Sequence, residues 1–101
     1  MNRNIVLVCS FGLSTSLLVN SMETAAKEAG AQVRIRAIGS NEVPDVVDET
    51  DVFLIAPQVR YLLNGIAAHG LPAGVIEGRA YALADGRAAL HQALSLLEQG
   101  V

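Results

Sequence analysis

Two short stretches of the chain are apolar at every position. They are residues 5–8 and Val52–Ile55, and each ends at residues that favour a turn. A strand that is apolar on both sides is buried on both faces, as the inner strands of a parallel sheet are. The pattern therefore predicts two central strands of a parallel sheet.

Two further segments predict weaker strands. Residues 32–37 alternate between polar and apolar, with Val33, Ile35 and Ala37 on one side and arginines on the other. This alternation is typical of a strand with one solvent-exposed face and favours an edge position. Residues 73–76 form a shorter apolar run, which we interpret as a fourth strand.

Between these strands, apolar residues recur at helical spacing. Gly30 and Gly70 suit the ends of the first two helices, Pro57 suits the start of the second, and Asp85 suits the cap of the last. A short helix is also expected over residues 43–47. The apolar stripes are Leu18, Met22, Ala25 and Ala29; Val59, Leu62, Leu63, Ile66 and Ala67; and Leu90, Ala93, Leu94 and Leu97.

Strands and helices thus alternate along the whole chain. This order predicts a single α/β domain over residues 1–101, with a four-stranded parallel sheet and helices on both faces. The expected strand order is 2-1-3-4, as in flavodoxin-like folds.

Composition narrows the classes of function. The 101 residues are 51% hydrophobic and 17% charged, which favours a folded domain with a core over a disordered chain. The net charge is −3 and there is no run of basic residues, which argues against binding to nucleic-acid phosphates. The apolar runs are too short to span a bilayer, and residues 1–4 do not resemble a signal peptide. One cysteine allows no internal disulfide, and no Cys/His cluster has metal-ligand spacing. We expect a soluble, cytoplasmic protein without a structural metal.

The candidate chemistry lies in the loop after the first strand. Ligands of open parallel sheets bind beyond the carboxyl ends of the strands, next to the switch in strand order. Cys9 is expected there, where unpaired amides at a helix amino terminus attract anions and stabilise a thiolate. The expected anion cradle consists of Ser10, Phe11, Gly12, Leu13, Ser14, Thr15 and Ser16.

The same cradle would suit a dianionic phosphoryl group carried on the sulfur of Cys9. Three other uses of a lone loop cysteine are weighed against this one. A dithiol redox enzyme needs a second cysteine, which is absent. A small cysteine phosphatase needs an arginine six residues after its nucleophile, where this chain has Thr15. A non-enzymatic anion-binding domain with a buried, inert Cys9 and a simple Ser/Thr helix cap also remains open.

The chain resembles the lactose/cellobiose-type enzyme IIB of the bacterial sugar phosphotransferase system. The resemblance rests on Cys-Ser-Phe-Gly-Leu-Ser-Thr-Ser-Leu-Leu-Val at residues 9–19, on the Pro-Gln-containing segment 54–63, and on Tyr81 with Asp85-Gly86. Phe11 and Ala56 depart from the pattern, because a small residue and a glycine are expected there.

The resemblance implies a phosphocysteine relay. Cys9 would accept a phosphoryl group from a phosphohistidine on enzyme IIA and pass it to a sugar entering through the membrane component, enzyme IIC. The domain would then associate with the membrane only through enzyme IIC, and donor and acceptor would make a metal or cofactor unnecessary.

Other polar residues have simpler interpretations. Gln58 and Tyr81 are expected on loops at the active end of the sheet and are candidates for lining the site. His69 suits a helix end and His91 a helix surface. Arginines at 60, 79 and 87 are candidates for attracting a phosphorylated partner from the surface, and Asp45, Asp48, Glu49 and Asp51 are expected to form an exposed acidic face.

Overall fold

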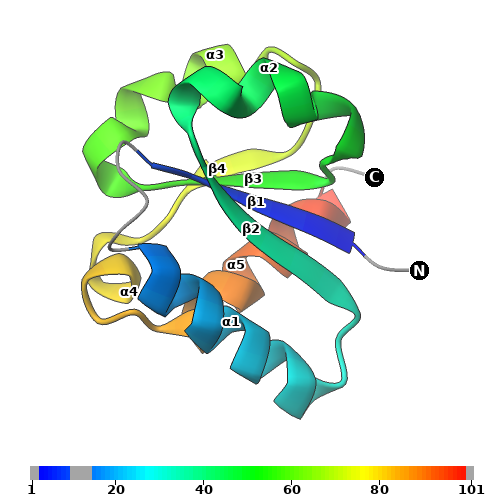
Figure 1. The fold of residues 1–101 in the computed structure, drawn as a ribbon, viewed down its shortest axis with the longest axis vertical. Coiled ribbons are helices and arrows are strands. Elements are labelled where there is room, and N and C mark those ends of the chain that lie inside the picture. The colour runs from blue at the N-terminus through cyan, green and yellow to red at the C-terminus, as the bar shows by residue number, and fades with distance from the viewer. Residues whose placement is uncertain (1–2, 10–14, 100–101) are drawn as a thin grey trace.

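The sheet has the predicted topology. The computed structural model describes residues 3–9 and 15–99, which form a four-stranded parallel sheet in the order β2-β1-β3-β4. In chain order the strands are β1 (Arg3–Cys9), β2 (Val33–Gly39), β3 (Val52–Ile55) and β4 (Ala73–Val75). Because all the strands are parallel, every carboxyl end lies at one edge of the sheet, which we call the carboxyl edge (Figure 1).

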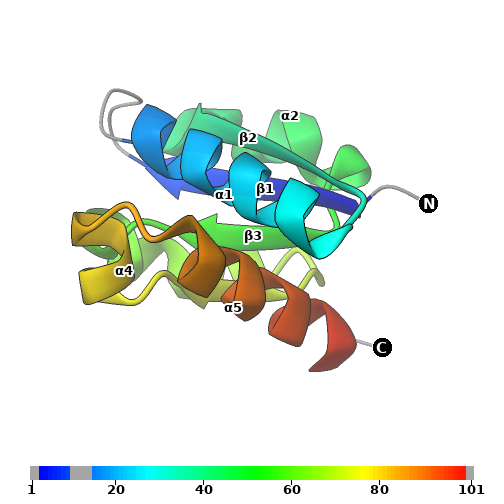
Figure 2. The same ribbon diagram turned by 90° about the horizontal axis from the view of Figure 1, so that it is seen from below.

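Helices cover both faces of the sheet. Helices α2 and α3 lie on one side and α1 and α5 on the other, where α5 runs beside α1 (Figures 1 and 2). Their bounds are α1 Thr15–Ala29, α2 Val43–Val46, α3 Leu63–Ala67, α4 Gly78–Ala82 and α5 Gly86–Gln99. Short 3₁₀ turns occupy Ser40–Glu42, Val47–Glu49 and Pro57–Leu62.

The segment after β3 differs from the continuous helix that its apolar stripe predicts. It begins with the 3₁₀ turn Pro57–Leu62, in which Val59 has non-helical angles (φ −118°, ψ 28°), and α3 follows only from Leu63. The Val59 N–H donates to the carbonyl of Ala56 in a tight turn, at 3.0 Å, and the Val59 side chain is buried. Burial of this β-branched side chain thus goes together with a kink in the helical stripe.

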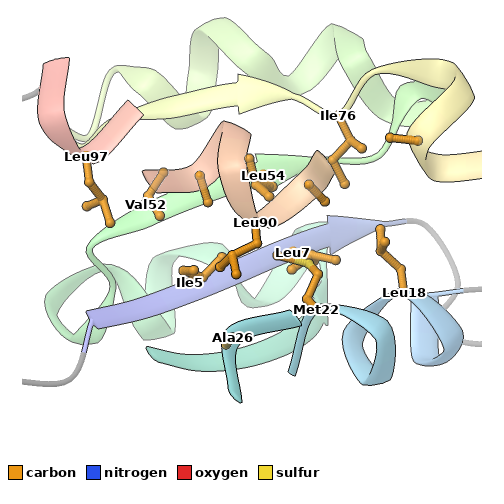
Figure 3. Packing of buried hydrophobic residues seen from close by; sticks show 13 residues of the cluster. Ile5, Leu7, Leu18, Met22, Ala26, Val52, Leu54, Ile76, Leu90 and Leu97 are labelled. Carbon is orange, nitrogen blue, oxygen red and sulfur yellow. The ribbon is translucent and has the colours of Figure 1, made fainter. Parts of the chain in front are cut away.

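The hydrophobic core forms two clusters, one on each face of the sheet. Ile5 and Leu7 of β1 face α1 and α5, where they pack with Leu18 and Met22 (Figure 3). The intervening residues of β1 belong to the cluster beneath α2 and α3. This alternation confirms that β1 is buried on both faces, as its unbroken apolar sequence predicts.

The two outer strands of the sheet, β2 and β4, are both protected against pairing with another strand. On β2, the side chains of Val33 and Ile35 pack toward the α1 face, whereas Arg34 and Arg36 are exposed, as predicted for an edge strand. On β4, the side-chain amide of Gln92 donates to the carbonyl of Val75 at 2.6 Å. Each outer strand therefore carries polar groups that disfavour pairing with another strand.

The junction between α4 and α5 is tightly hydrogen-bonded. Ala84 has φ 51°, and the following N–H, that of Asp85, donates to the carbonyl of Ala80 at 2.8 Å. This six-residue closure is the Schellman motif that commonly ends helices. The Asp85 carboxylate then accepts from the N–H of Ala88 at 3.1 Å, which confirms the predicted cap of α5.

We expect Ala84→Gly to stabilise the protein by about 1 kcal/mol, because a left-handed conformation costs an L-residue about that much. Urea unfolding followed by circular dichroism measures the change. Ala82→Gly, at the last residue of α4, is the matched control and should destabilise the protein, since glycine is a poorer helix former than alanine. Equal effects of the two substitutions would contradict the assigned backbone strain.

Candidate functional site

Cys9 is the last residue of β1, at the point where the strand order switches. Strand β1 lies between β2 and β3, and Cys9 pairs with Gly39 at the carboxyl edge. The chain leaves β1 toward one side of the sheet and leaves β3 toward the other, so a crevice between the two strand ends is expected at this point. The cysteine therefore lies where open α/β sheets bind their ligands.

The thiol of Cys9 is buried and oriented. The residue is 2% exposed and belongs to the cluster beneath α2 and α3. Its Sγ donates a hydrogen bond to the carbonyl of Ile38 on the neighbouring strand, at a sulfur–oxygen distance of 3.7 Å. The sulfur therefore lies just beneath the surface of the carboxyl edge, and a partner group must come close to reach it.

The predicted anion cradle is described only where α1 begins. Ser10, Phe11, Gly12, Leu13 and Ser14 lie outside the described residues. Thr15 is the first residue of α1, and Ser16 is exposed in its first turn. Helix α1 thus begins six residues after Cys9, and its amino terminus faces the same edge of the sheet (Figure 1).

Two polar candidates follow neighbouring strands at this edge. Gln58 is exposed in the turn after β3, and the buried residue Ala56 extends the pairing of β3 with β1 because its N–H donates to the carbonyl of Val8 at 2.8 Å. Tyr81 lies on helix α4, so its predicted position on a loop is wrong. Its half-buried ring packs against both hydrophobic clusters, which places it across the end of the sheet.

Helix α4 is the element at this edge that the sequence interpretation missed. It contains only five residues and begins at Gly78, so it shows no apolar stripe. Arg79, Ala80 and Ala82 are good helix formers, and this propensity is the signal that would have identified it. Ala80 is buried in the cluster on the α1 side, and Tyr81 packs against both clusters, so the helix lies across the strand ends.

The remaining polar candidates are surface residues with one exception. His69, His91, Arg60, Arg79 and Arg87 are exposed, and so are Asp45, Asp48 and Glu49. The Arg87 guanidinium lies 3.6 Å from the Glu28 carboxylate, on the side of α1 and α5. Asp51 is not part of an exposed face: it is half-buried and accepts from the N–H of Asn4 at 2.7 Å, which joins β1 to the segment before β3.

No three His, Cys, Asp or Glu side chains among residues 3–9 and 15–99 lie close enough together to hold a metal ion. Likewise, none of the helices formed by these residues has the length and hydropathy that crossing a bilayer requires.

Comparison with known proteins decides the family. The sequence profile of the lactose/cellobiose-specific IIB subunits of the phosphotransferase system (PTS) matches residues 4–92. The chain belongs to this family. The resemblance inferred from the motif around Cys9 is therefore confirmed. PTS IIB components act in phosphoryl transfer during sugar uptake, together with IIA and IIC components.

Individual relatives cover nearly the whole PTS IIB domain. The chain is 36% identical over 99 residues to the oligo-beta-mannoside-specific EIIB component of Bacillus subtilis, which covers 94% of this chain and 96% of that protein. It is similar in structure to the cellobiose-specific IIB component of Borrelia burgdorferi, with a TM-score of 0.84 and 31% identity over 99% of this chain and 95% of that one.

A fused relative connects the domain to a membrane transporter. The lactose-specific EIICB component of Streptococcus mutans is 29% identical over 93 residues, which cover 86% of this chain but 16% of that longer protein. In that relative the IIB domain and the IIC component form one polypeptide.

Proposed function

We propose that Cys9 is the phosphoryl carrier of this PTS IIB component. It accepts a phosphoryl group from a phosphohistidine on enzyme IIA and passes it to a sugar bound by the membrane enzyme IIC. The chain is then a protein-phosphocysteine–sugar phosphotransferase that works at the cytoplasmic face of the membrane. The observation that carries the proposal is the position of Cys9 at the strand-order switch, six residues before the amino terminus of α1.

The first transfer exchanges a phosphorus–nitrogen bond for a phosphorus–sulfur bond. The Sγ of Cys9 attacks phosphorus while the imidazole nitrogen of the donor leaves. In the resting protein the thiol of Cys9 donates a hydrogen bond to the Ile38 carbonyl. During the transfer the thiol hydrogen moves to that imidazole nitrogen.

The second transfer moves the group from sulfur to a sugar hydroxyl. The sulfur–phosphorus bond breaks, a phosphorus–oxygen bond forms, and a base on the acceptor side takes the hydroxyl proton. A thiolate is a good leaving group, so this domain needs no general acid to release it.

Stable storage between the two transfers needs donors that hold the phosphoryl group without activating it. We assign this role to the amides at the start of α1 and to the hydroxyls of Ser10, Ser14, Thr15 and Ser16, which are neutral donors. An arginine, which grips the spreading charge of a phosphoryl transition state in phosphatases, is absent from the equivalent position. We assign Gln58 and Tyr81 to the lining of the site, and donor and acceptor supply the remaining groups in place of a metal or cofactor.

Mass spectrometry tests the assignment. After incubation with phosphorylated enzyme IIA, the intact protein should gain the mass of one phosphoryl group, and peptide mapping should locate it on Cys9. Adding IIC-containing membranes and sugar should remove it. A phosphoryl group on another residue, or release of phosphate from a monoester without any adduct, would contradict the proposal; the second result would favour a phosphatase.

A further inference from the structure

Large hydrophobic side chains are exposed at only three positions in the described part of the chain. They are Leu17 (69% exposed), Tyr61 (76%) and Leu83 (65%). Isolated exposed hydrophobic residues are common on soluble proteins, but a group of them on one surface marks a contact site. The position of these three residues in the fold therefore matters.

All three residues belong to segments that lie at the carboxyl edge. Leu17 is in the first turn of α1, Tyr61 is in the turn that follows β3, and Leu83 follows α4, the helix after β4. These three segments meet at the end of the sheet where β1 finishes (Figures 1 and 2). Tyr61 also lines a shallow groove that continues from Ser40, the first residue after β2, between α2 and α3.

Two exposed arginines belong to the same segments. Arg60 precedes Tyr61 and Arg79 is on α4; both are exposed, and neither forms an ion pair with another described residue. Among the carboxylates there, that of Glu42 accepts a hydrogen bond from the N–H of Gly39 at 2.9 Å, and Glu77 is exposed before α4. An approaching phosphate group thus meets two arginines that form no ion pair with a described carboxylate.

We propose that Leu17, Tyr61 and Leu83 are the apolar anchors of a docking surface for the phosphorylated donor protein, with Arg60 and Arg79 attracting its phosphate. This inference rests on the proposed function of Cys9. The buried thiol demands a partner that covers the carboxyl edge, because Cys9 is 2% exposed and its sulfur must reach bonding distance of phosphorus. The arginines favour the loaded donor over the acceptor, because the donor brings a dianion whereas a sugar is neutral.

The test compares a triple variant, Leu17→Gln, Tyr61→Gln and Leu83→Gln, with the wild type and with the control Ala29→Gln. Ala29 is exposed at the other end of α1, away from the carboxyl edge. Initial rates of Cys9 phosphorylation are measured against the concentration of phosphorylated enzyme IIA. We expect kcat/KM to fall about tenfold or more in the triple variant, chiefly through KM, because truncating central apolar anchors costs that much affinity.

A second pair of variants tests the role of charge. Arg60→Gln together with Arg79→Gln should lower kcat/KM at low salt and flatten its dependence on ionic strength, since attraction of a charged partner is screened by salt. The rate of Cys9 alkylation by iodoacetamide should stay at the wild-type value in all variants, which shows that the site itself is intact.

Four other results would overturn the inference, and they are distinguishable from one another. An unchanged KM for the donor, with Cys9 still phosphorylated, removes the docking surface but leaves the carrier function standing. Slower sugar phosphorylation from preloaded protein, with normal loading, assigns the surface to the acceptor instead. A change in sedimentation from an oligomer to a monomer assigns it to a second copy of the chain. Failure of the wild type to load Cys9 overturns the proposed function itself.

Discussion

A Cys9→Ser variant is expected to lose sugar phosphorylation by about a thousandfold or more, because a hydroxyl is a far weaker nucleophile than a thiol and an alkoxide a far poorer leaving group than a thiolate. Serine keeps the shape of the side chain and is able to donate to the Ile38 carbonyl as the thiol does. The measurement is the rate of sugar phosphate formation with enzyme IIA, IIC-containing membranes and a phosphoryl donor system.

Two controls separate chemistry from folding. Cys9→Ala should be as inactive as Cys9→Ser, and circular dichroism and thermal unfolding should show both variants folded. Ser16→Ala, an exposed hydroxyl at the start of α1, should retain much more activity than either, because other donors remain around the phosphoryl group. Sugar phosphorylation by Cys9→Ser at the wild-type rate would eliminate the cysteine as carrier.

The second large effect is expected at Gly86, the first residue of α5. Gly86 is buried against α1, and a Cβ atom built there would lie 2.1 Å from the carbonyl carbon of Ser21 and 2.3 Å from the amide nitrogen of Met22. The Gly86 N–H also donates to the Ser21 hydroxyl at 2.9 Å, across 65 residues of sequence. Backbone atoms of a helix cannot move aside as a flexible side chain can.

Gly86→Ala should therefore lower the free energy of unfolding by about 3 kcal/mol, at the upper end of the usual cost of overpacking. Urea denaturation measures the loss as a lower midpoint. Gly65→Ala is the matched control, because Gly65 lies within α3 and a Cβ there meets nothing within 4 Å. That variant should be more stable than the wild type by about 1 kcal/mol, since alanine favours a helix more than glycine. Equal effects at the two glycines would contradict the close packing of α5 on α1.

Much of the fold follows from local patterns. Strand β3 has the bounds that its four apolar residues predict, and the alternation of β2 correctly places its arginines in solvent. Asp85 caps α5 as its position before the last apolar stripe predicts. These features depend on residues close together in sequence, so a periodicity or a capping side chain is enough to identify them.

The failures arise where packing overrides local preference. The apolar stripe after Pro57 predicts one helix, but burial of Val59 divides the segment into a 3₁₀ turn and a short α3. Tyr81 was placed on a loop because α4 is too short to show a stripe. Asp51 resembles its acidic neighbours in sequence, and only its contact with Asn4 distinguishes it.

The sequence by itself determined the parallel α/β sheet, the location of Cys9 at the end of a buried strand, and the family, because each depends on residue types in consecutive order. The tertiary structure alone decided that Cys9 is buried, that Gly86 touches Ser21, and that the segments carrying Leu17, Tyr61 and Leu83 lie at one edge. The physical reason is that such contacts depend on how helices cross and pack on a sheet. That geometry results from the whole core rather than from any one segment.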